Sequence, residues 1–247
     1  MSPFINRFTE FVKSLLPRKY EVDSFLDDFF SQPEDKKIIQ VGANDGVMSD
    51  PLRPFLTSPG NYRAILVEPI PFYVAKLQKL YTERKDIRII QGALGSENKI
   101  GTLYFIPPHV ADLMNGEGPQ NNWAHGQGSF DRNIVVHWIE QNKFRGDKYC
   151  QQVPYFISSI DHIDIPIHQV KELISPSDQN LLLVVDVQGF ELEVLKGIDW
   201  DYPPEFIMIE DDLDNPNNVI GYLESKGYRY VCGTSDKIFS YGKLRKF

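Results

Sequence analysis

The chain is 247 residues long and carries a formal net charge of −8, with a sequence pI near 5.2. This acidity argues against a broad basic face, so we expect no nucleic-acid partner. The two cysteines, Cys150 and Cys232, are too few for a disulfide framework, and no Cys/His cluster suggests structural zinc. No stretch approaches the roughly 18 apolar residues of a membrane span, so a cytoplasmic protein is the default expectation.

The first residues predict an amphipathic helix. In 3–16, "PFINRFTEFVKSLL", apolar side chains recur at helical spacing, and Pro17 closes the pattern. Such a helix either binds a membrane surface or a partner, or packs on its own domain or on a second subunit. Only Arg7 and Lys13 charge its polar face positively, which favours packing and allows for a homodimer through this helix.

The main domain is expected at 37–247, after an N-terminal helical extension (1–36) with a second short helix from Val22 to Phe30. From Lys37 onward, apolar runs alternate with helical segments, which predicts an α/β fold with parallel strands and helices on both faces. The predicted strands are 37–41, 63–68, 87–91, 180–187 and 205–210, with a terminal antiparallel hairpin at 228–233 and 237–242. The predicted helices between them are 49–57, 71–83, 189–197 and 215–226.

Residues 98–160 interrupt this alternation. We expect strands at 101–106 and 153–160, and a helix at 131–144 with Asp131 as its N-cap. Residues 107–130 are rich in Pro, Gly, Asn and Gln without periodicity, and a long irregular segment within a domain is typical of a functional loop. We therefore interpret 98–160 as an insertion on the substrate side.

The ends of the predicted strands carry glycine and polar residues. After the first strand, in "GANDG", Gly42 permits close backbone approach and Gly46 allows the turn into the next helix. The second strand ends in Glu68, which is placed to accept hydrogen bonds from ribose hydroxyls. Ligands of open parallel sheets bind outside the carboxyl ends of the strands, so these ends predict one site. The other strand ends of this set are "QGALG", "DVQGFE" and "IEDD".

The spacing from Gly46 to Glu68 matches one βαβ unit that binds an adenosine. A dinucleotide usually needs GxGxxG, but the third glycine is absent, and Asp45 would put negative charge beside the phosphates. S-adenosylmethionine has no phosphate, and its ammonium and sulfonium groups are cationic. The turn therefore favours a methyltransferase over a nucleotide-dependent oxidoreductase that uses NAD.

Several segments match one family in its own order, from about residue 38 to 210: "VGANDG", "LVEPIPFYVAKLQ", "GALG" with "LYF", "GSF" ahead of "SSID", "DVQGFELEVLKGI" and "FIMIE". With these the sequence resembles the FkbM family of S-adenosylmethionine-dependent methyltransferases. The resemblance implies a Rossmann-like class I methyltransferase fold: a mainly parallel seven-stranded sheet with helices on both faces and a C-terminal antiparallel hairpin. It also implies O-methylation of a hydroxyl on a small molecule, sugar or glycan.

The resemblance also implies roles for individual residues. Two positions depart from the family's Lys-Ile-Asp-x-Glu-Gly motif, because Val184 replaces the Lys and Gln188 replaces the Glu. Any role of that Glu, including base catalysis, is thereby in doubt. The implied cofactor contacts are Gly42, Asn44 and Asp45 at the methionine and ribose, Glu68 at the ribose diol, Gln91, Gly92 and Ala93 at the adenine, and Asp186 at the reacting centre.

Methyl transfer to a hydroxyl requires removal of its proton. We expect the catalytic candidates to be Asp186, Glu210 and His125, the last from a loop able to close over substrate. Glu191 is expected in the first turn of a helix and His137 in mid-helix, both with structural roles. We expect no metal, with magnesium on Asp186, Glu210 and Asp211 as the alternative.

The sequence thus predicts an S-adenosylmethionine-dependent O-methyltransferase. The rival enzyme is the NAD-dependent oxidoreductase, which the missing third glycine disfavours. The rival without catalysis is a cofactor-binding scaffold, for which Val184 and Gln188 are the suggestive features.

Overall fold

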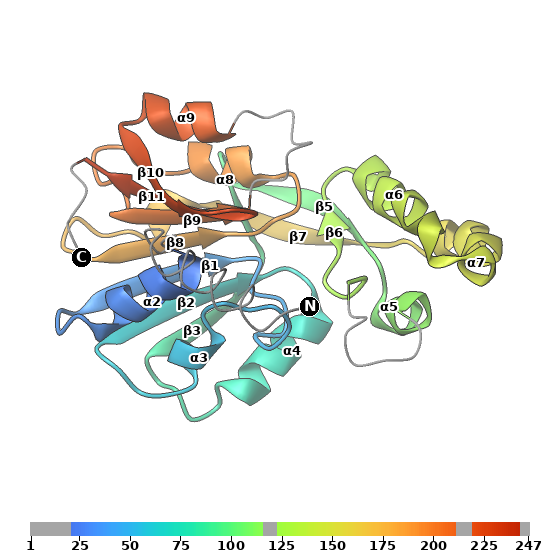
Figure 1. Ribbon diagram of the computed structural model, residues 1–247, viewed down its shortest axis with the longest axis horizontal. Helices are drawn as coiled ribbons and strands as arrows, with labels where there is room; N and C mark the ends of the chain where they lie inside the picture. The colour runs from blue at the N-terminus through green and yellow to red at the C-terminus, as the bar shows by residue number, and fades with distance from the viewer. Residues whose placement is uncertain (1–20, 116–122, 211–218, 243–247) are drawn as a thin grey trace, which may run out of the picture.

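A seven-stranded sheet forms the centre of the protein (Figure 1). The computed structural model describes residues 21–115, 123–210 and 219–242. In spatial order the strands are β10 (Tyr228–Gly233), β11 (Asp236–Tyr241), β9 (Phe206–Glu210), β8 (Leu181–Val185), β1 (Lys36–Val41), β2 (Tyr62–Glu68) and β3 (Ile87–Gln91). All neighbours from β9 to β3 pair in parallel, whereas β11 is antiparallel to both β9 and β10. The predicted mainly parallel sheet with its C-terminal hairpin is confirmed.

Helices cover both faces of this sheet because its central strands are apolar on both sides. All residues of β1 and β8 are buried. Alternate residues of β1 join different cores: Ile38 packs with α2, α3 and α4, and Ile39 packs with α8 and α9. Figure 1 shows these two helical layers on opposite sides of the strands. The helices are α2 (Val22–Ser31), α3 (Arg53–Leu56), α4 (Pro71–Leu80), α8 (Glu191–Lys196) and α9 (Val219–Ser225).

Helix α2 confirms the short helix predicted from Val22 to Phe30, and it packs into the core of the sheet. Phe25 and Phe29 are buried, and the ring centroids of Phe25 and Phe206 lie 5.0 Å apart. The helix predicted at 3–16, with the homodimer expected through it, lies outside the described residues.

Residues 93–169, which include the predicted insertion at 98–160, form a second, smaller sheet and a helical cluster, and the cluster stands to the side of the main sheet in Figure 1. The sheet has the order β4 (Ala93–Gly95), β7 (Asp161–Gln169), β5 (Lys99–Phe105) and β6 (Gly128–Ser129). The cluster consists of α5 (Pro108–Asn115), α6 (Arg132–Gln141) and α7 (Asp147–Ser158), with the 3₁₀ turn η1 (Asn142–Arg145) between α6 and α7. A second 3₁₀ turn, η2 (Val170–Glu172), follows β7. Asp131 caps α6 as predicted, since its side chain accepts a hydrogen bond from the Asn133 amide at 2.8 Å.

Two expectations for the insertion were wrong. The strand predicted at 153–160 is the second half of α7, because Tyr149, Val153 and Phe156 recur at helical spacing and are buried together. The irregular segment predicted at 107–130 contains α5. The strand that pairs with β5 is β7, which follows the predicted strand at 153–160 in the chain. The two strands pair antiparallel from Phe105↔Asp161 to Lys99↔Ile167.

None of the helices within the described residues is long and apolar enough to cross a membrane.

Candidate active site

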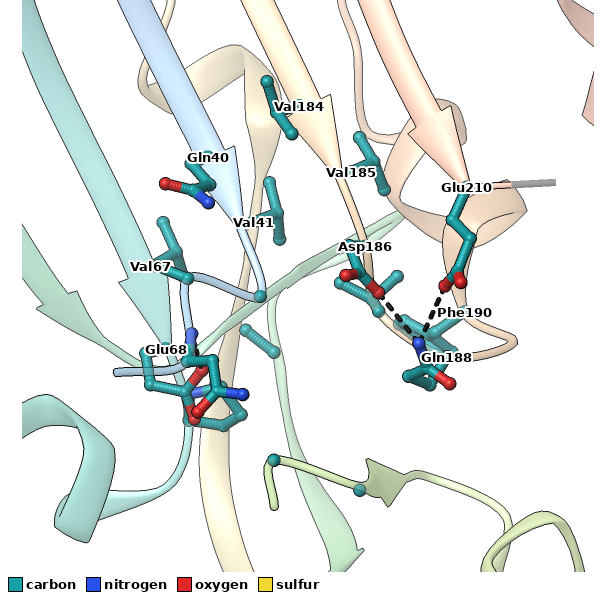
Figure 2. A pocket seen from close by; sticks show the side chains of 18 of the residues that line it. Gln40, Val41, Val67, Glu68, Val184, Val185, Asp186, Gln188, Phe190 and Glu210 are labelled. Carbon is teal, nitrogen blue, oxygen red and sulfur yellow. Dashed lines mark hydrogen bonds between the residues drawn. The ribbon is translucent and has the colours of Figure 1, made fainter. Parts of the chain in front are cut away.

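A cavity of about 690 Å³ opens at the carboxyl edge of the main sheet. Its walls come from the ends of β1, β2, β8 and β9, the start of β11, and the segment 123–130 of the insertion. Figure 2 shows Glu68 on the β2 side, facing Asp186, Gln188 and Glu210 on the side of β8 and β9. Eight of the predicted site residues line this cavity: Gly42, Asn44, Glu68, Gly92, Ala93, His125, Asp186 and Glu210.

The loop after β1 is bound tightly to the strand ends on both sides. The amides of Gly42 and Ala43 donate to the Val67 carbonyl at 2.9 and 3.1 Å, and the Asp186 amide donates to the Val41 carbonyl at 3.0 Å. Gly42 has a φ of +85°, and a Cβ there would lie 1.8 Å from the Asp186 carbonyl oxygen. Only glycine fits this close approach, which brings the β1 and β8 ends together as the cavity floor.

Glu68 is a buried acid whose carboxylate is held by two backbone amides. One oxygen accepts from the Asn44 amide and the other from the Ile70 amide, both at 2.9 Å. Burial raises the pKa of Glu68 to about 7, and the charges of Asp186 and Asp45 add to this rise against the two hydrogen bonds. The carboxylate therefore has a fixed orientation and a strong need for further hydrogen-bond donors when it is ionised.

Two predicted cofactor residues, Asp45 and Gln91, are not among the residues that line the cavity. Asp45 is bound within its own turn, accepting from the amides of Val47 and Met48 at 3.0 and 2.9 Å and pairing with Lys76 at 3.3 Å. Burial acts to raise the pKa of Asp45, but these hydrogen bonds and Lys76 outweigh it and hold the pKa below its usual range. Gln91 ends β3 with an exposed side chain.

On the opposite side, the amide of Gln188 joins two carboxylates (Figure 2). Its Nε2 donates to Asp186 Oδ1 at 2.9 Å and to Glu210 Oε2 at 2.7 Å. Asp236 also lines the cavity and pairs with Glu210 in the β11–β9 register. Burial raises the pKa of Asp236, and the charge of Asp186 raises it further.

His125 belongs to a hydrogen-bonded chain that fastens the insertion to α4. Its Nε2 lies 2.9 Å from Asp112 Oδ1, and its Nδ1 lies 3.2 Å from the hydroxyl of the buried Tyr73. That hydroxyl also accepts from the Gly126 amide at 2.8 Å. Both ring nitrogens of His125 therefore already have partners, so the geometry supports a role in holding the segment 123–130 over the cavity.

The remaining candidates have structural surroundings. The Glu191 carboxylate is buried and accepts from the Gly189 amide at 2.8 Å at the start of α8. His137 is exposed on α6, with its Nε2 2.6 Å from the Gln141 amide nitrogen. Among the described residues no group of three or more acidic, histidine or cysteine side chains could hold a metal ion. Asp211, part of the magnesium alternative, lies outside the described residues.

Some residues of the cavity are not among the predicted site residues. Gln40 interrupts the apolar run from Ile38 to Val41, which is a visible signal, and its Nε2 lies 3.2 Å from Asp50 Oδ1. Asp236 of the cavity lining carries no such signal, and neither does Tyr73, whose hydroxyl holds the lining residues His125 and Gly126 from outside; only the packing of distant segments brings them to the site.

Five buried polar atoms on residues that line the cavity have no hydrogen-bond partner within the described part of the chain. Four are acceptors and one is a donor, and the described lining includes no Lys or Arg. A ligand that donates hydrogen bonds and carries positive charge satisfies such walls, whereas a pyrophosphate would find no cationic side chain. The atoms are Gln40 Oε1, Asn44 Oδ1, Asp50 Oδ2, Gln127 Oε1 and Trp123 Nε1.

Comparison with known families agrees with this acceptor-rich lining. Residues 40–230 match the model of the methyltransferase FkbM domain. The chain belongs to this family. The methyl donor of FkbM methyltransferases is S-adenosylmethionine, whose ribose hydroxyls, ammonium and sulfonium suit the acceptor-rich walls. None of the curated proteins matches the chain.

Three solved methyltransferases are similar in fold to this FkbM-family chain at low sequence identity. The methyltransferase FkbM from Methylobacillus flagellatus KT is 14% identical with a TM-score of 0.48, over 84% of this chain and 44% of that one, so this chain spans less than half its length. Precorrin-6y C5,15-methyltransferase from Geobacter metallireducens GS-15 is 10% identical with a TM-score of 0.41, over 93% and 92% of the two chains. A TehB-like SAM-dependent methyltransferase from Corynebacterium glutamicum ATCC 13032 Kitasato is 9% identical with a TM-score of 0.41, over 97% and 96%.

Proposed function

We propose that this FkbM methyltransferase methylates a hydroxyl of a small molecule or glycan that carries no phosphate. The observation that carries the proposal is the cavity lining. It contains carboxylates and hydrogen-bond acceptors without a partner, and none of the described lining residues is Lys or Arg. Such a lining attracts donors and cations and repels anions. It favours S-adenosylmethionine over NAD and a neutral or cationic acceptor over an anionic one.

The residues at the β1 and β2 ends would hold the cofactor. Gly42 would allow the cofactor to approach the backbone closely. The Glu68 carboxylate, which the Asn44 and Ile70 amides fix in place, would accept hydrogen bonds from both ribose hydroxyls. Gly92 and Ala93 would lie on the adenine side. When bound, S-adenosylmethionine supplies an electrophilic methyl group on a cationic sulfur.

The residues at the β8 and β9 ends would receive the acceptor. Asp186 or Glu210 would take the proton of the acceptor hydroxyl, while the other carboxylate orients the hydroxyl by accepting a hydrogen bond. Trp123 and Phe130 from the insertion would exclude water, and the Phe130 and Phe190 rings already contact each other at 4.5 Å between centroids.

A methyl-donor assay on pooled hydroxylated metabolites and glycans, with S-adenosylhomocysteine release and the mass shift of the product as readouts, tests this function. Asp186→Asn and Glu210→Gln should each lower turnover by about 100-fold or more, since one removes the proton acceptor and the other removes the carboxylate that orients the hydroxyl, while cofactor binding persists. His125→Ala should cost less, because His125 holds the loop. Turnover at the wild-type level in both carboxylate variants would refute the assignment, and binding without any product would favour the scaffold.

A further inference from the structure

The cavity continues from the strand ends onto one face of the main sheet. Gln40 of β1 pairs with Val184 of β8 in the sheet register, and Val184 pairs with Met208 of β9. Register partners project to the same face, so these three side chains form a row, and all three line the cavity. Glu210, two residues after Met208, pairs with Asp236 of β11. Asp236 therefore lies on this same face, at the β11 end of the cavity.

Asp236 differs from the other acids of the cavity lining, because no group of the described chain donates a hydrogen bond to its carboxylate. Burial raises the pKa of Asp236, the charge of Asp186 raises it further, and no hydrogen bond acts in the opposite direction. A ligand with a hydrogen-bond donor would supply what this carboxylate lacks. The other lining acids each accept at least one hydrogen bond: Asp50 from the Leu52 amide, Glu68 from the Asn44 and Ile70 amides, and Asp186 and Glu210 from Gln188.

A second acceptor without a partner lies on the same face. The Gln40 side chain is 5% exposed, its Nε2 lies 3.2 Å from Asp50 Oδ1, and its Oε1 has no partner among the described residues. Between Gln40 and Asp236 the cavity floor is apolar, because Val184 and Met208 form it. This face therefore suits a ligand that carries hydrogen-bond donors on a carbon skeleton.

The β11 end of the cavity is remote from the residues proposed for the adenosine. β11 lies four strands from β2 in the sheet order, and adjacent strands are about 4.8 Å apart, so Asp236 and Glu68 are separated by roughly 19 Å across the sheet. Gly92 follows β3, one strand further away. An adenosine held at Glu68 and Gly92 does not reach Asp236, which leaves this end of the cavity for the methyl acceptor.

The charge of the lining favours an ammonium group over a hydroxyl beside Asp236. None of the described lining residues is Lys or Arg, and Val184 replaces the lysine of the family's motif. The carboxylates of Asp186 and Glu210 add negative charge near Asp236. A hydrogen bond from an ammonium to a carboxylate is charge-assisted and about twice as strong as one between neutral groups.

We propose that Asp236 is a specificity-determining residue of the acceptor site, which binds an ammonium group of the methyl acceptor while the acceptor's carbon skeleton lies over Val184 and Met208. This inference rests on the proposed function. The acceptor class is then an amino alcohol, in which one hydroxyl receives the methyl group and the amine is held by Asp236. An acceptor without the amine leaves the partly buried carboxylate without a strong donor and binds more weakly.

Two probes with the same ring and hydroxyl test this assignment. Aminocyclohexanol carries an ammonium on the adjacent carbon, where cyclohexanediol carries a second hydroxyl. Saturation-transfer NMR titration measures the affinity of each probe for the protein loaded with S-adenosylhomocysteine. The variants are Asp236→Asn, which removes the charge, and Val184→Lys, which places a cation on the cavity floor. The control is Asp27→Asn, which removes the same charge at an exposed position of α2 outside the cavity lining.

Wild type and Asp27→Asn should bind the amine at least about tenfold more tightly than the diol. Asp236→Asn and Val184→Lys should each reduce this preference to about threefold or less. A purely structural effect of either substitution would weaken both probes alike and keep the preference. The absence of a preference in wild type, or an unchanged preference in either folded variant, overturns the inference.

The methionine part of the cofactor also carries an ammonium, and a further comparison separates the two sources. S-adenosylhomocysteine has this ammonium, whereas methylthioadenosine lacks it. We expect Asp236→Asn to bind both with the affinity of wild type. A loss of affinity for S-adenosylhomocysteine alone would assign Asp236 to the cofactor and overturn its role with the acceptor. Failure of wild type to bind S-adenosylmethionine and S-adenosylhomocysteine would instead overturn the proposed function.

Discussion

In the proposed function, Glu68 makes cofactor binding depend on pH. Burial raises its pKa to about 7 in the free protein, and the ribose hydroxyls donate much more strongly to the ionised carboxylate than to the neutral acid. Below pH 7 the acid must lose its proton to make these strong hydrogen bonds, so affinity falls as pH falls. The dissociation constant for S-adenosylmethionine should rise about five- to tenfold from pH 7.5 to 6.0, as measured by calorimetry. Glu68→Gln should bind more weakly without this pH dependence, and an equal dependence in that variant would assign it to another group.

Gly42 determines how closely the ends of β1 and β8 approach. Gly42→Ala places a Cβ 1.8 Å from the Asp186 carbonyl oxygen at a φ of +85°, whereas Gly146→Ala, at a φ of +111°, meets no atom within 4 Å. The second variant should lose about 1–3 kcal/mol of unfolding free energy from backbone strain, and the first at least about 2 kcal/mol more. Urea denaturation measures both, and equal losses would show that the two strand ends do not approach this closely.

At the scale of elements, the segment 123–130 is held over the cavity by α4. Tyr73→Phe removes the hydroxyl that serves the Gly126 amide and His125, which leaves a backbone donor without a partner at a cost of about 1–3 kcal/mol. Amide hydrogen exchange in 123–130 should become about tenfold faster. Tyr230→Phe, which removes a hydrogen bond to the Gly233 carbonyl in the terminal hairpin, should leave that exchange unchanged. Unaltered exchange in Tyr73→Phe would argue against this attachment.

At the scale of the whole molecule, α2 contributes to the core of the main sheet. Phe25 is fully buried against Phe206, whereas Phe144 is 80% exposed in the insertion. Phe25→Ala should lower the free energy of unfolding by about 3–5 kcal/mol, and Phe144→Ala should change it by no more than about 0.5 kcal/mol. Urea denaturation tests this, and a small effect of Phe25→Ala would make residues before 37 an extension and not part of the domain.

The main sheet could be predicted because its strands are buried on both faces and so appear in the sequence as continuous apolar runs, as in 181–185. The insertion could not be predicted in the same way. Apolar and aromatic residues at 153–157 suggest a strand, and the helix becomes evident only when Tyr149 is included and Pro154 is tolerated within it. The alternation of Ile163, Ile165 and Ile167 in β7 was readable, but Pro166 lies within it.

The candidate site likewise contains residues that the sequence predicts and contacts that it does not. Gly42, Glu68 and Asp186 could be placed from the sequence, because parallel strands bring their carboxyl ends to one edge. The hydrogen bonds from Gly126 to Tyr73 and from Gln188 to Glu210 join segments that are far apart in the sequence. No local sequence pattern relates these segments, so the contacts are evident only in the three-dimensional structure.

We propose that the acceptor-rich cavity at the carboxyl edge of the sheet binds S-adenosylmethionine. The most direct test is calorimetric titration of the wild type with S-adenosylmethionine and with NAD, with Glu68→Ala as the matched variant. We predict that S-adenosylmethionine binds, that NAD does not, and that Glu68→Ala weakens binding by about 10- to 100-fold through the loss of charge-assisted hydrogen bonds. Tighter binding of NAD, or no binding of S-adenosylmethionine, would contradict the account.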